Sequence, residues 1–197
     1  MSTAMNSMST GVPLVLRDGS RVRVRQGLRT DRDLLLRGYE RLGSESRYQR
    51  FLTPMGELAE NTVRYMIELD HHDHEAIIAL DGRGEGIGDA FYVRDPKRPE
   101  AAEVAVTVID AWQGRGVGTL LLEAIGARAR DEGIATFTAL MLARNRQMMR
   151  LFERLGPVRI IDRAAGTVEI EVAIRCAGVA AELKELLRIA ARHDVAD

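Results

Sequence analysis

The chain has 197 residues, of which 46% are hydrophobic and 29% are charged. This length predicts one domain with a sizeable core, and the composition excludes a collagenous, low-complexity or mostly disordered chain. The 28 basic and 29 acidic residues give a net charge of -1. Such a balance argues against a dedicated nucleic-acid-binding protein, because phosphate contacts normally require a basic surplus.

The ends of the chain and its cysteine content indicate where the protein works. No apolar run approaches the roughly 18 residues that a membrane helix needs, and the opening MSTAMNSMSTG lacks the basic start and the hydrophobic stretch of a signal peptide. The single cysteine, Cys176, permits no intrachain disulfide and offers no metal-ligand spacing. We therefore expect a cytoplasmic protein with a flexible tail at residues 1–12.

Hydrophobic patterns predict the first elements. Ser20–Gly27 places Val22 and Val24 on one face and arginines on the other, the period-two pattern of a half-exposed strand. A helix is expected over Asp31–Leu42, where a glycine follows it. The stretch SESRYQRFLTP is expected to be a loop that leads to a second helix at Leu58–Leu69.

Three strand candidates follow in quick succession, a pattern typical of an antiparallel meander, at Glu75–Leu80, Ile87–Arg94 and Ala101–Ile109. Gly116–Glu132 then repeats apolar residues at helical spacing. A strand, a helix and a strand pair are expected after it, at Thr136–Leu142, Asn145–Leu155, Arg159–Asp162 and Thr167–Ile174. An apolar stripe in the last segment predicts an amphipathic helix at 177–197, after a domain at 13–176.

The most informative segment is a glycine turn of sequence QGRGVGT, residues 113–119, between a predicted strand and a predicted helix. At such a helix start the backbone N–H groups are unpaired, and glycines allow an anion to approach closely. The segment therefore predicts a phosphate-binding turn. A Walker loop is excluded because Gly118 is followed by Thr119 and Leu120, and the G-x-G-x-x-G dinucleotide fingerprint fails because position 119 is threonine.

The turn matches the Gln/Arg-x-x-Gly-x-Gly/Ala signature of the GNAT superfamily of acyl-CoA-dependent N-acyltransferases, at Gln113, Gly116 and Gly118. The order of the elements around it also resembles this family, including the Asn, helix, aromatic and Gly pattern of NRQMMRLFERLG. More narrowly, SRYQRFLTP, DHHDHEAIIALDG and AEVAVTVIDAWQGRGVG resemble the catalytic domain of bacterial protein-lysine acetyltransferases.

The resemblance implies a mixed α/β GNAT fold, with a mostly antiparallel sheet of about seven strands flanked by helices. It also implies transfer of an acetyl group from the co-substrate acetyl-CoA to a primary amine, such as a protein lysine, by direct attack in a ternary complex and without a metal. A small-molecule amine as acceptor and a non-catalytic acyl-CoA-binding module stay open as alternatives. We expect a monomer or homodimer that binds neither nucleic acid nor membranes.

In this family the CoA pyrophosphate lies on the amides of the glycine turn, and the pantetheine arm pairs with the edge of the preceding strand. The resemblance therefore assigns donor binding to Ala105, Val106, Thr107, Val108, Gln113, Gly114, Arg115, Gly116, Val117, Gly118, Thr119 and Asn145.

A general base is needed because the attacking amine must be neutral, whereas a lysine amine has an ordinary pKa of about 10.4. Strand alternation puts Glu103 on the same face as Ala105 and Thr107. The matching glutamate is the base in the lysine-acetyltransferase relatives, so Glu103 is our candidate for this role.

Three other features have alternative interpretations. Tyr48, Arg50 and Phe51 either border the acceptor or pack the first two helices together. Many family members have a tyrosine after the Asn of the second motif that protonates the departing thiolate, and the matching residue is Phe152. The histidines of DHHDHE suggest a metal site, but consecutive residues cannot easily all point at one ion, so we expect a solvated loop.

Overall fold

The computed structural model describes residues 11–54 and 56–175. They form a sheet in the order β1-β2-β3-β4-β5-β6-β8-β7, which is antiparallel except between β5 and β6. The strands span Val12–Val15 (β1), Arg21–Gln26 (β2), His74–Asp81 (β3), Gly86–Asp95 (β4), Arg98–Val108 (β5), Thr136–Leu142 (β6), Val158–Ala164 (β7) and Thr167–Ala173 (β8). The mixed α/β fold and its antiparallel meander, β3 to β5, are thus confirmed.

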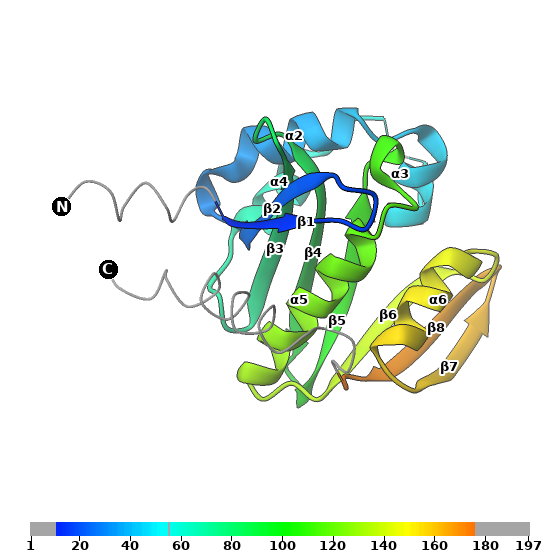
Figure 1. Cartoon of the computed structure of the whole chain (residues 1–197). Helices are drawn as coiled ribbons and strands as arrows, with labels where there is room; N and C mark the ends of the chain where they lie inside the picture. Colours follow the sequence, from blue (N-terminus) through cyan, green and yellow to red (C-terminus); the bar gives the residue numbers. More distant parts are fainter. Residues whose placement is uncertain (1–10, 55, 176–197) are drawn as a thin grey trace.

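Helices cover both faces of the sheet (Figure 1). α5 packs against β3, β4 and β5 on one face, while α2 packs on the other face, and α6 packs against α5 and β8. The helices span Arg29–Asp31 (η1), Arg32–Glu40 (α2), Ser44–Phe51 (α3), Glu60–Ile67 (α4), Asp110–Trp112 (η2), Val117–Asp131 (α5) and Arg146–Leu155 (α6).

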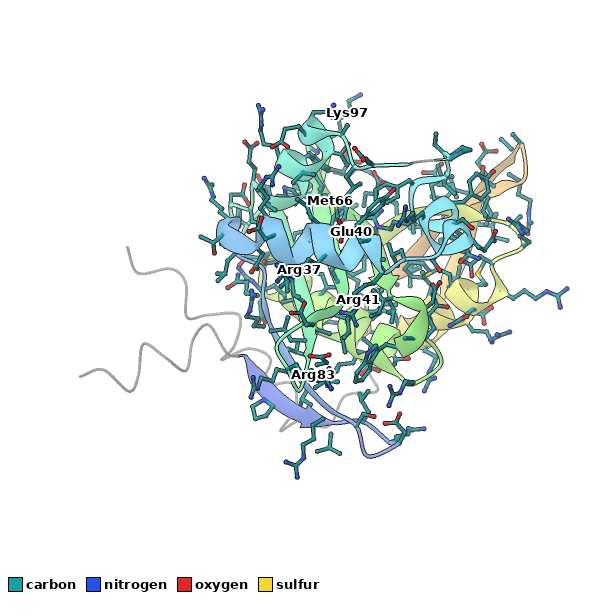
Figure 2. The ribbon with its side chains drawn as sticks, turned by 90° about the horizontal axis from the view of Figure 1, so that it is seen from above. Arg37, Glu40, Arg41, Met66, Arg83 and Lys97 are labelled. Carbon is teal, nitrogen blue, oxygen red and sulfur yellow. The ribbon has the colours of Figure 1, made fainter. Side chains whose placement is uncertain are left out.

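α2 divides its side chains between core and solvent, as an amphipathic helix should. Arg37, Glu40 and Arg41 lie on its outer surface (Figure 2), whereas Tyr39 is buried. Arg41 Nη1 donates a hydrogen bond to the carbonyl oxygen of Gly86 at 3.0 Å, which joins the end of α2 to the start of β4.

The core between α5 and the sheet holds the glycine turn in place. Leu121, Ile125 and Ala129 are fully buried at helical spacing, and the buried rings of Tyr92 and Phe137 belong to the same cluster. Burial of each large apolar side chain contributes about 1.5–3 kcal/mol. Because this packing fixes the axis of α5, it also fixes the direction in which the first amides of the helix point.

The first strand is an addition to the expected fold. β1 raises the sheet to eight strands and includes Val12, which the sequence analysis placed in a flexible tail. Pro13 lies opposite Arg23 of β2, at the edge of the sheet. A proline is tolerated on an edge strand, because its missing N–H group breaks no hydrogen bond of a central ladder. Pro13 is therefore compatible with a strand at this position.

The stretch expected to be a loop contains α3, and arginines form much of its inner face. The guanidinium of Arg47 lies 4.4 Å from the ring centre of Tyr39, and that of Arg50 lies 4.7 Å from the ring centre of Phe91. Arginine stems cover apolar surface and their heads stack on aromatic rings. The segment therefore lacks the apolar periodicity by which an amphipathic helix is recognised in a sequence.

Two expectations fall largely outside the described residues, namely the tail before residue 11 and the C-terminal helix at 177–197. In the part of the chain that the structure describes, no helix combines the length and the hydrophobicity that a membrane span requires.

Candidate active site

The site begins where β5 and β6 separate. Their parallel pairing covers only Ala101–Glu103 against Thr136–Thr138. Beyond this point β5 continues alongside β4, while β6 continues alongside β8. The two strands thus form a fork at Glu103, and the edge of β5 beyond it lines a cleft at Val106, Thr107 and Val108.

This cleft, named the donor cleft after the ligand that the resemblance assigns to it, has a volume of about 1050 Å³ and is walled by β5, the glycine turn, α3 and α6. It brings together most of the residues assigned to donor binding, namely Val106, Thr107, Val108, Gln113, Gly114, Arg115, Gly116, Gly118, Thr119 and Asn145. Two others do not line the cleft. The side chain of Val117 is buried in the core, and Ala105 pairs with Phe91 in the sheet.

The glycine turn has the backbone geometry of an anion site. Gly114 and Gly116 have φ angles of +73° and +96°, a region that favours glycine. Gly116 is the N-cap of α5, and no side chain caps the helix there. Leu120 donates the first bond of the helix, to Gly116 O at 3.0 Å. The amides of residues 117–119 precede it, where a helix leaves its N–H groups for a ligand.

The charge that lines the donor cleft is mainly basic. Arg17, Arg115, Arg150 and Arg154 contribute to its wall, and arginine is well suited to bind phosphate groups. Arg115 is itself held in place, since its Nε atom lies 2.6 Å from Asp18 Oδ2 and its guanidinium stacks 4.2 Å from the ring centre of Trp112.

Asp18 anchors this arginine in its charged form. The backbone N–H group of Ser20 and the Arg115 guanidinium lower the pKa of Asp18 to about 2. The carboxylate therefore stays ionised at any physiological pH, and the β1–β2 turn is tied to the glycine turn by this ion pair.

The side chain of Gln113 fixes the glycine turn to its neighbours through hydrogen bonds. Its Nε2 atom donates to Val108 O, Asp110 Oδ1 and Ser46 Oγ, each at 3.1 Å. Asp110 Oδ2 also accepts from the N–H group of Gly43 at 3.0 Å. The side chain expected to shape the rim of the phosphate site thus connects the end of β5 with α3.

Asn145 connects the two helices that flank the cleft. Its Oδ1 atom accepts a hydrogen bond from Met148 N at 3.0 Å, which caps α6. Its Nδ2 atom donates to Gln49 Oε1 of α3 at 3.2 Å. Asn145 also lines the cleft.

Glu103 is exposed on the sheet face that lies opposite α5. The pairing of β3, β4 and β5 puts His74, Val93 and Glu103 in one row across the sheet. Phe91 and Ala105 form the next row on the same face. The carboxylate can therefore be reached from solvent, but Glu103 does not itself line the cleft, whose first residue on β5 is Val106, three positions further along the strand.

Of the three expected acceptor residues of α3, Arg50 and Phe51 stay together, with the guanidinium 5.1 Å from the ring centre, whereas Tyr48 lies apart. Arg50 lines the donor cleft, and also a small apolar cavity of about 70 Å³ behind it. Phe51 packs edge-on against Tyr39, with ring centres 5.8 Å apart. Tyr48 lines a different surface hollow together with Pro54. Only Arg50 thus lies beside both the cleft and the face that carries Glu103.

Phe152 is not positioned to contact a donor. Its side chain is 1% exposed and belongs to the core cluster, whereas the cleft is lined by its neighbours on α6, such as Leu151 and Glu153. At this position the structure offers no proton donor for a departing thiolate.

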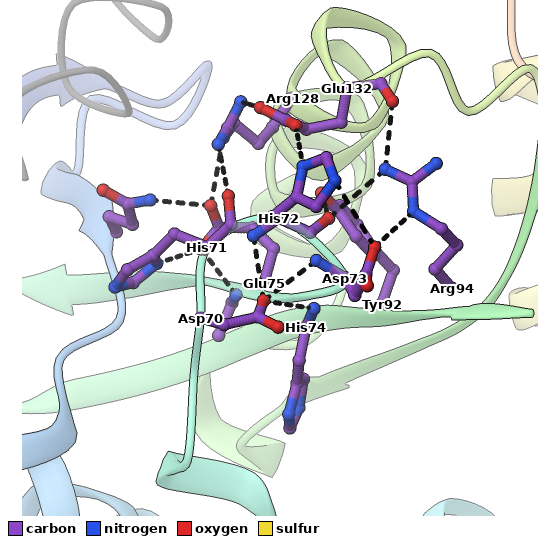
Figure 3. A network of polar contacts seen from close by, with 12 residues as sticks. Asp70, His71, His72, Asp73, His74, Glu75, Tyr92, Arg94, Arg128 and Glu132 are labelled. Atoms are coloured by element: carbon purple, nitrogen blue, oxygen red, sulfur yellow. Dashed lines mark hydrogen bonds and ion pairs between the residues drawn. The ribbon is translucent and has the colours of Figure 1, made fainter. Parts of the chain in front are cut away.

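The histidine loop is more ordered than the solvated loop that we expected (Figure 3). His71 Nδ1 lies 2.9 Å from Glu75 Oε1, and His72 pairs with Glu132. The ring of His74 points away from this network, toward Tyr65 at 5.1 Å between ring centres. Within the described ranges, no group of three or more His, Cys, Asp or Glu side chains is arranged to hold a metal ion.

Several residues of the site escaped the sequence analysis. Ser46 and Gln49 line the cleft, and they were missed because α3 was expected to be a loop. Arg150 and Arg154 carried a usable signal, since their i, i+4 spacing puts both on one face of a predicted helix beside the glycine turn.

Comparison with known proteins agrees with this geometry. The family model of the acetyltransferase (GNAT) family matches residues 38–156, more than half of the chain. The chain therefore belongs to the GNAT acetyltransferase family.

Individual relatives support the same assignment. The chain is 34% identical over 164 residues to the acetyltransferase Pat of Mycolicibacterium smegmatis, covering 83% of this chain and 49% of that protein. The chain thus spans about half the length of this relative. The GNAT domain of S. lividans PAT superimposes with a TM-score of 0.76 at 35% identity, covering 83% of this chain and 96% of that domain.

A more distant structure shares the fold alone. The putative acetyltransferase yncA from Salmonella typhimurium, solved with its cofactor acetyl-CoA, superimposes with a TM-score of 0.62 at 16% identity. It covers 77% of this chain and 93% of that protein.

Proposed function

We propose that this protein is an N-acetyltransferase that transfers the acetyl group of acetyl-CoA to a primary amine, with a protein lysine side chain as the first candidate. The observation that carries the proposal is that one cleft is lined both by the edge of β5 beyond its fork with β6, at Val106–Val108, and by the glycine turn at the start of α5. The acetyl-CoA in the distant yncA structure and the names of the closer relatives are in keeping with this donor.

The donor would lie along the cleft from the glycine turn to the fork. The amides of residues 117–119 and the cleft arginines would hold its pyrophosphate. The pantetheine arm would pair with the free edge of β5 at Val106–Val108, beside Asn145. A backbone N–H group on that edge would polarise the thioester carbonyl, a preorganised donor for charge that develops in the transition state.

The acceptor amine would approach from the exposed side of Glu103. The carboxylate takes a proton from the amine directly or through one water, the amine nitrogen attacks the thioester carbonyl, and the carbon–sulfur bond breaks. Direct transfer is supported by the sequence position of the single cysteine, which lies beyond β8. We also propose that the protein works in the cytoplasm as a monomer or homodimer.

Two measurements test this proposal. Calorimetric titration with acetyl-CoA should release heat of binding, and mass spectrometry should detect acetyl groups on lysines of candidate proteins after incubation with donor and enzyme. Acetylation confined to polyamines or amino acids would replace the lysine assignment. Donor binding without transfer to any amine would favour the non-catalytic binding module, and a lack of binding would refute both.

The positive φ of Gly116 provides a further prediction. We expect G116A to weaken acetyl-CoA binding by about tenfold, because an alanine is strained at this φ and the shift that relieves its strain moves the amides; tenfold corresponds to about 1.4 kcal/mol. G84A is the matched control, because Gly84 also has a positive φ, of +85°, and a Cβ at either position meets nothing within 4 Å. Calorimetry should show unchanged affinity for G84A, and equal losses in both variants would contradict the role of the turn.

A further inference from the structure

Arg50 occupies the wall between two cavities. Its guanidinium lies 4.7 Å from the ring centre of Phe91 on β4 and 5.1 Å from that of Phe51 on α3. On one side it lines the donor cleft, next to Thr107 of β5, and on the other it lines the small apolar cavity of about 70 Å³. A cation therefore lies beside the segment of β5 where the thioester of the proposed donor would be held.

This cation lacks a permanent partner. Among the described residues no carboxylate lies within ion-pair distance of Arg50, and its Nε atom is buried without a hydrogen-bond partner. Burial lowers the pKa of Arg50, yet an arginine stays protonated at physiological pH. Buried donors are rarely left unpaired, so this arrangement is suited to an anion that arrives with a ligand.

Three titratable groups face Arg50 from the elements packed around it. They are Asp89 of β4, Glu103 of β5 and Tyr65 of α4. Asp89 and Glu103 both act on the guanidinium over a distance rather than in contact. When Glu103 accepts a proton it loses its charge, and the positive charge of Arg50 is then less compensated.

Thioester aminolysis creates a new anion in the same place. As the carbon–sulfur bond breaks, its electron pair stays on sulfur, while the proton of the amine goes to Glu103. The tyrosine that would protonate the sulfur in many family members is replaced by Phe152, which is buried in the core. The departing sulfur thus needs either another proton donor or a positive charge.

Resting on the proposed function, we infer that Arg50 is a catalytic residue that stabilises the CoA thiolate as it leaves, so that no proton donor is required. Arg50 remains protonated throughout, and the thiolate takes its proton from water after the transfer. Because the same step neutralises Glu103, transfer of the amine proton removes an opposing negative charge, and the net positive potential at the sulfur rises.

The pKa of the thiol in enzyme-bound CoA tests this inference without turnover. It is followed by the ultraviolet absorbance of the thiolate during a pH titration, after subtraction of the same titration with desulfo-CoA. In the wild type the thiol should ionise at least about one pH unit below the pKa of free CoA measured in the same way, because a nearby cation favours the anion. R50Q should remove this decrease, R50K should keep part of it, and E103Q should enlarge it.

R47Q is the matched control, since Arg47 lies on the same helix and stacks on Tyr39, outside the residues that line the cleft. It should leave the thiol pKa at the wild-type value. If R50Q does not fold, R50M, which keeps the apolar contacts with the two rings, is measured in its place.

A thiol pKa in R50Q equal to that of the wild type would overturn the role of Arg50 while leaving the proposed function intact. Failure of the wild type to bind CoA would overturn the proposed function itself. In steady-state assays the expected signature of R50Q is a loss in kcat of at least about tenfold with a much smaller change in the KM for acetyl-CoA, as for an interaction made in the transition state.

Discussion

E103Q should lower kcat by about 10²- to 10⁴-fold at neutral pH, the range typical for loss of a general base. The glutamine keeps the size and the exposed position of Glu103 at the fork of β5 and β6, but it cannot accept the amine proton. The loss should diminish as the pH rises toward the ordinary lysine pKa of about 10.4, because a growing fraction of the acceptor is then already neutral. Initial rates measured over this pH range check the expectation.

E100Q is the control for this substitution. Glu100 is an exposed glutamate on the same strand, three residues earlier and before the segment of β5 that pairs with β6. Its replacement should leave kcat unchanged, and acetyl-CoA should bind to both variants as to the wild type. If E103Q retains wild-type turnover between pH 7 and pH 9, another group is the base.

The donor half of the site could be predicted from sequence because its chemistry is local. A strand, a glycine turn and a helix follow one another without interruption, so the turn alone fixes where backbone amides converge. Most of the residues named from this motif do line the cleft. Val117 faces the core instead, because one face of the first helical turn packs against the sheet.

The acceptor half could not be predicted in the same way, because it depends on strand register. Glu103 lies in a row with His74, which is distant in sequence and reaches it only through the pairing of β3, β4 and β5. Tyr48 and Arg50 are two residues apart on α3, yet they line different cavities. Sequence periodicity cannot indicate which cavity each side chain faces when the segment is expected to be a loop and not a helix.

A buried carboxylate at the other end of α5 leads to the second large prediction. Glu75 is completely buried and is held by Gln26 Nε2 at 2.6 Å, His71 Nδ1 at 2.9 Å and Arg128 Nε at 3.0 Å (Figure 3). Arg128 also bonds to Glu132 and to the carbonyl oxygen of His71. The arginine is thus the cation that compensates the charge of Glu75.

R128M should lower the free energy of unfolding by about 3–5 kcal/mol, because it leaves a buried carboxylate without its ion-pair partner. Urea unfolding monitored by circular dichroism checks this value. R130M is the matched control: Arg130 is exposed two residues further along the same helix and donates one hydrogen bond, to Ile174 O at 2.8 Å. Its replacement should cost less than about 1.5 kcal/mol.

The double variant E75Q/R128M separates charge compensation from packing. Once Glu75 is replaced by a neutral amide, loss of Arg128 no longer leaves a buried charge without a partner. The double variant should therefore be more stable, by at least about 1 kcal/mol, than the sum of the two single effects predicts. Strict additivity would mean that Arg128 stabilises the loop through its stem and its bond to the His71 carbonyl rather than through its charge.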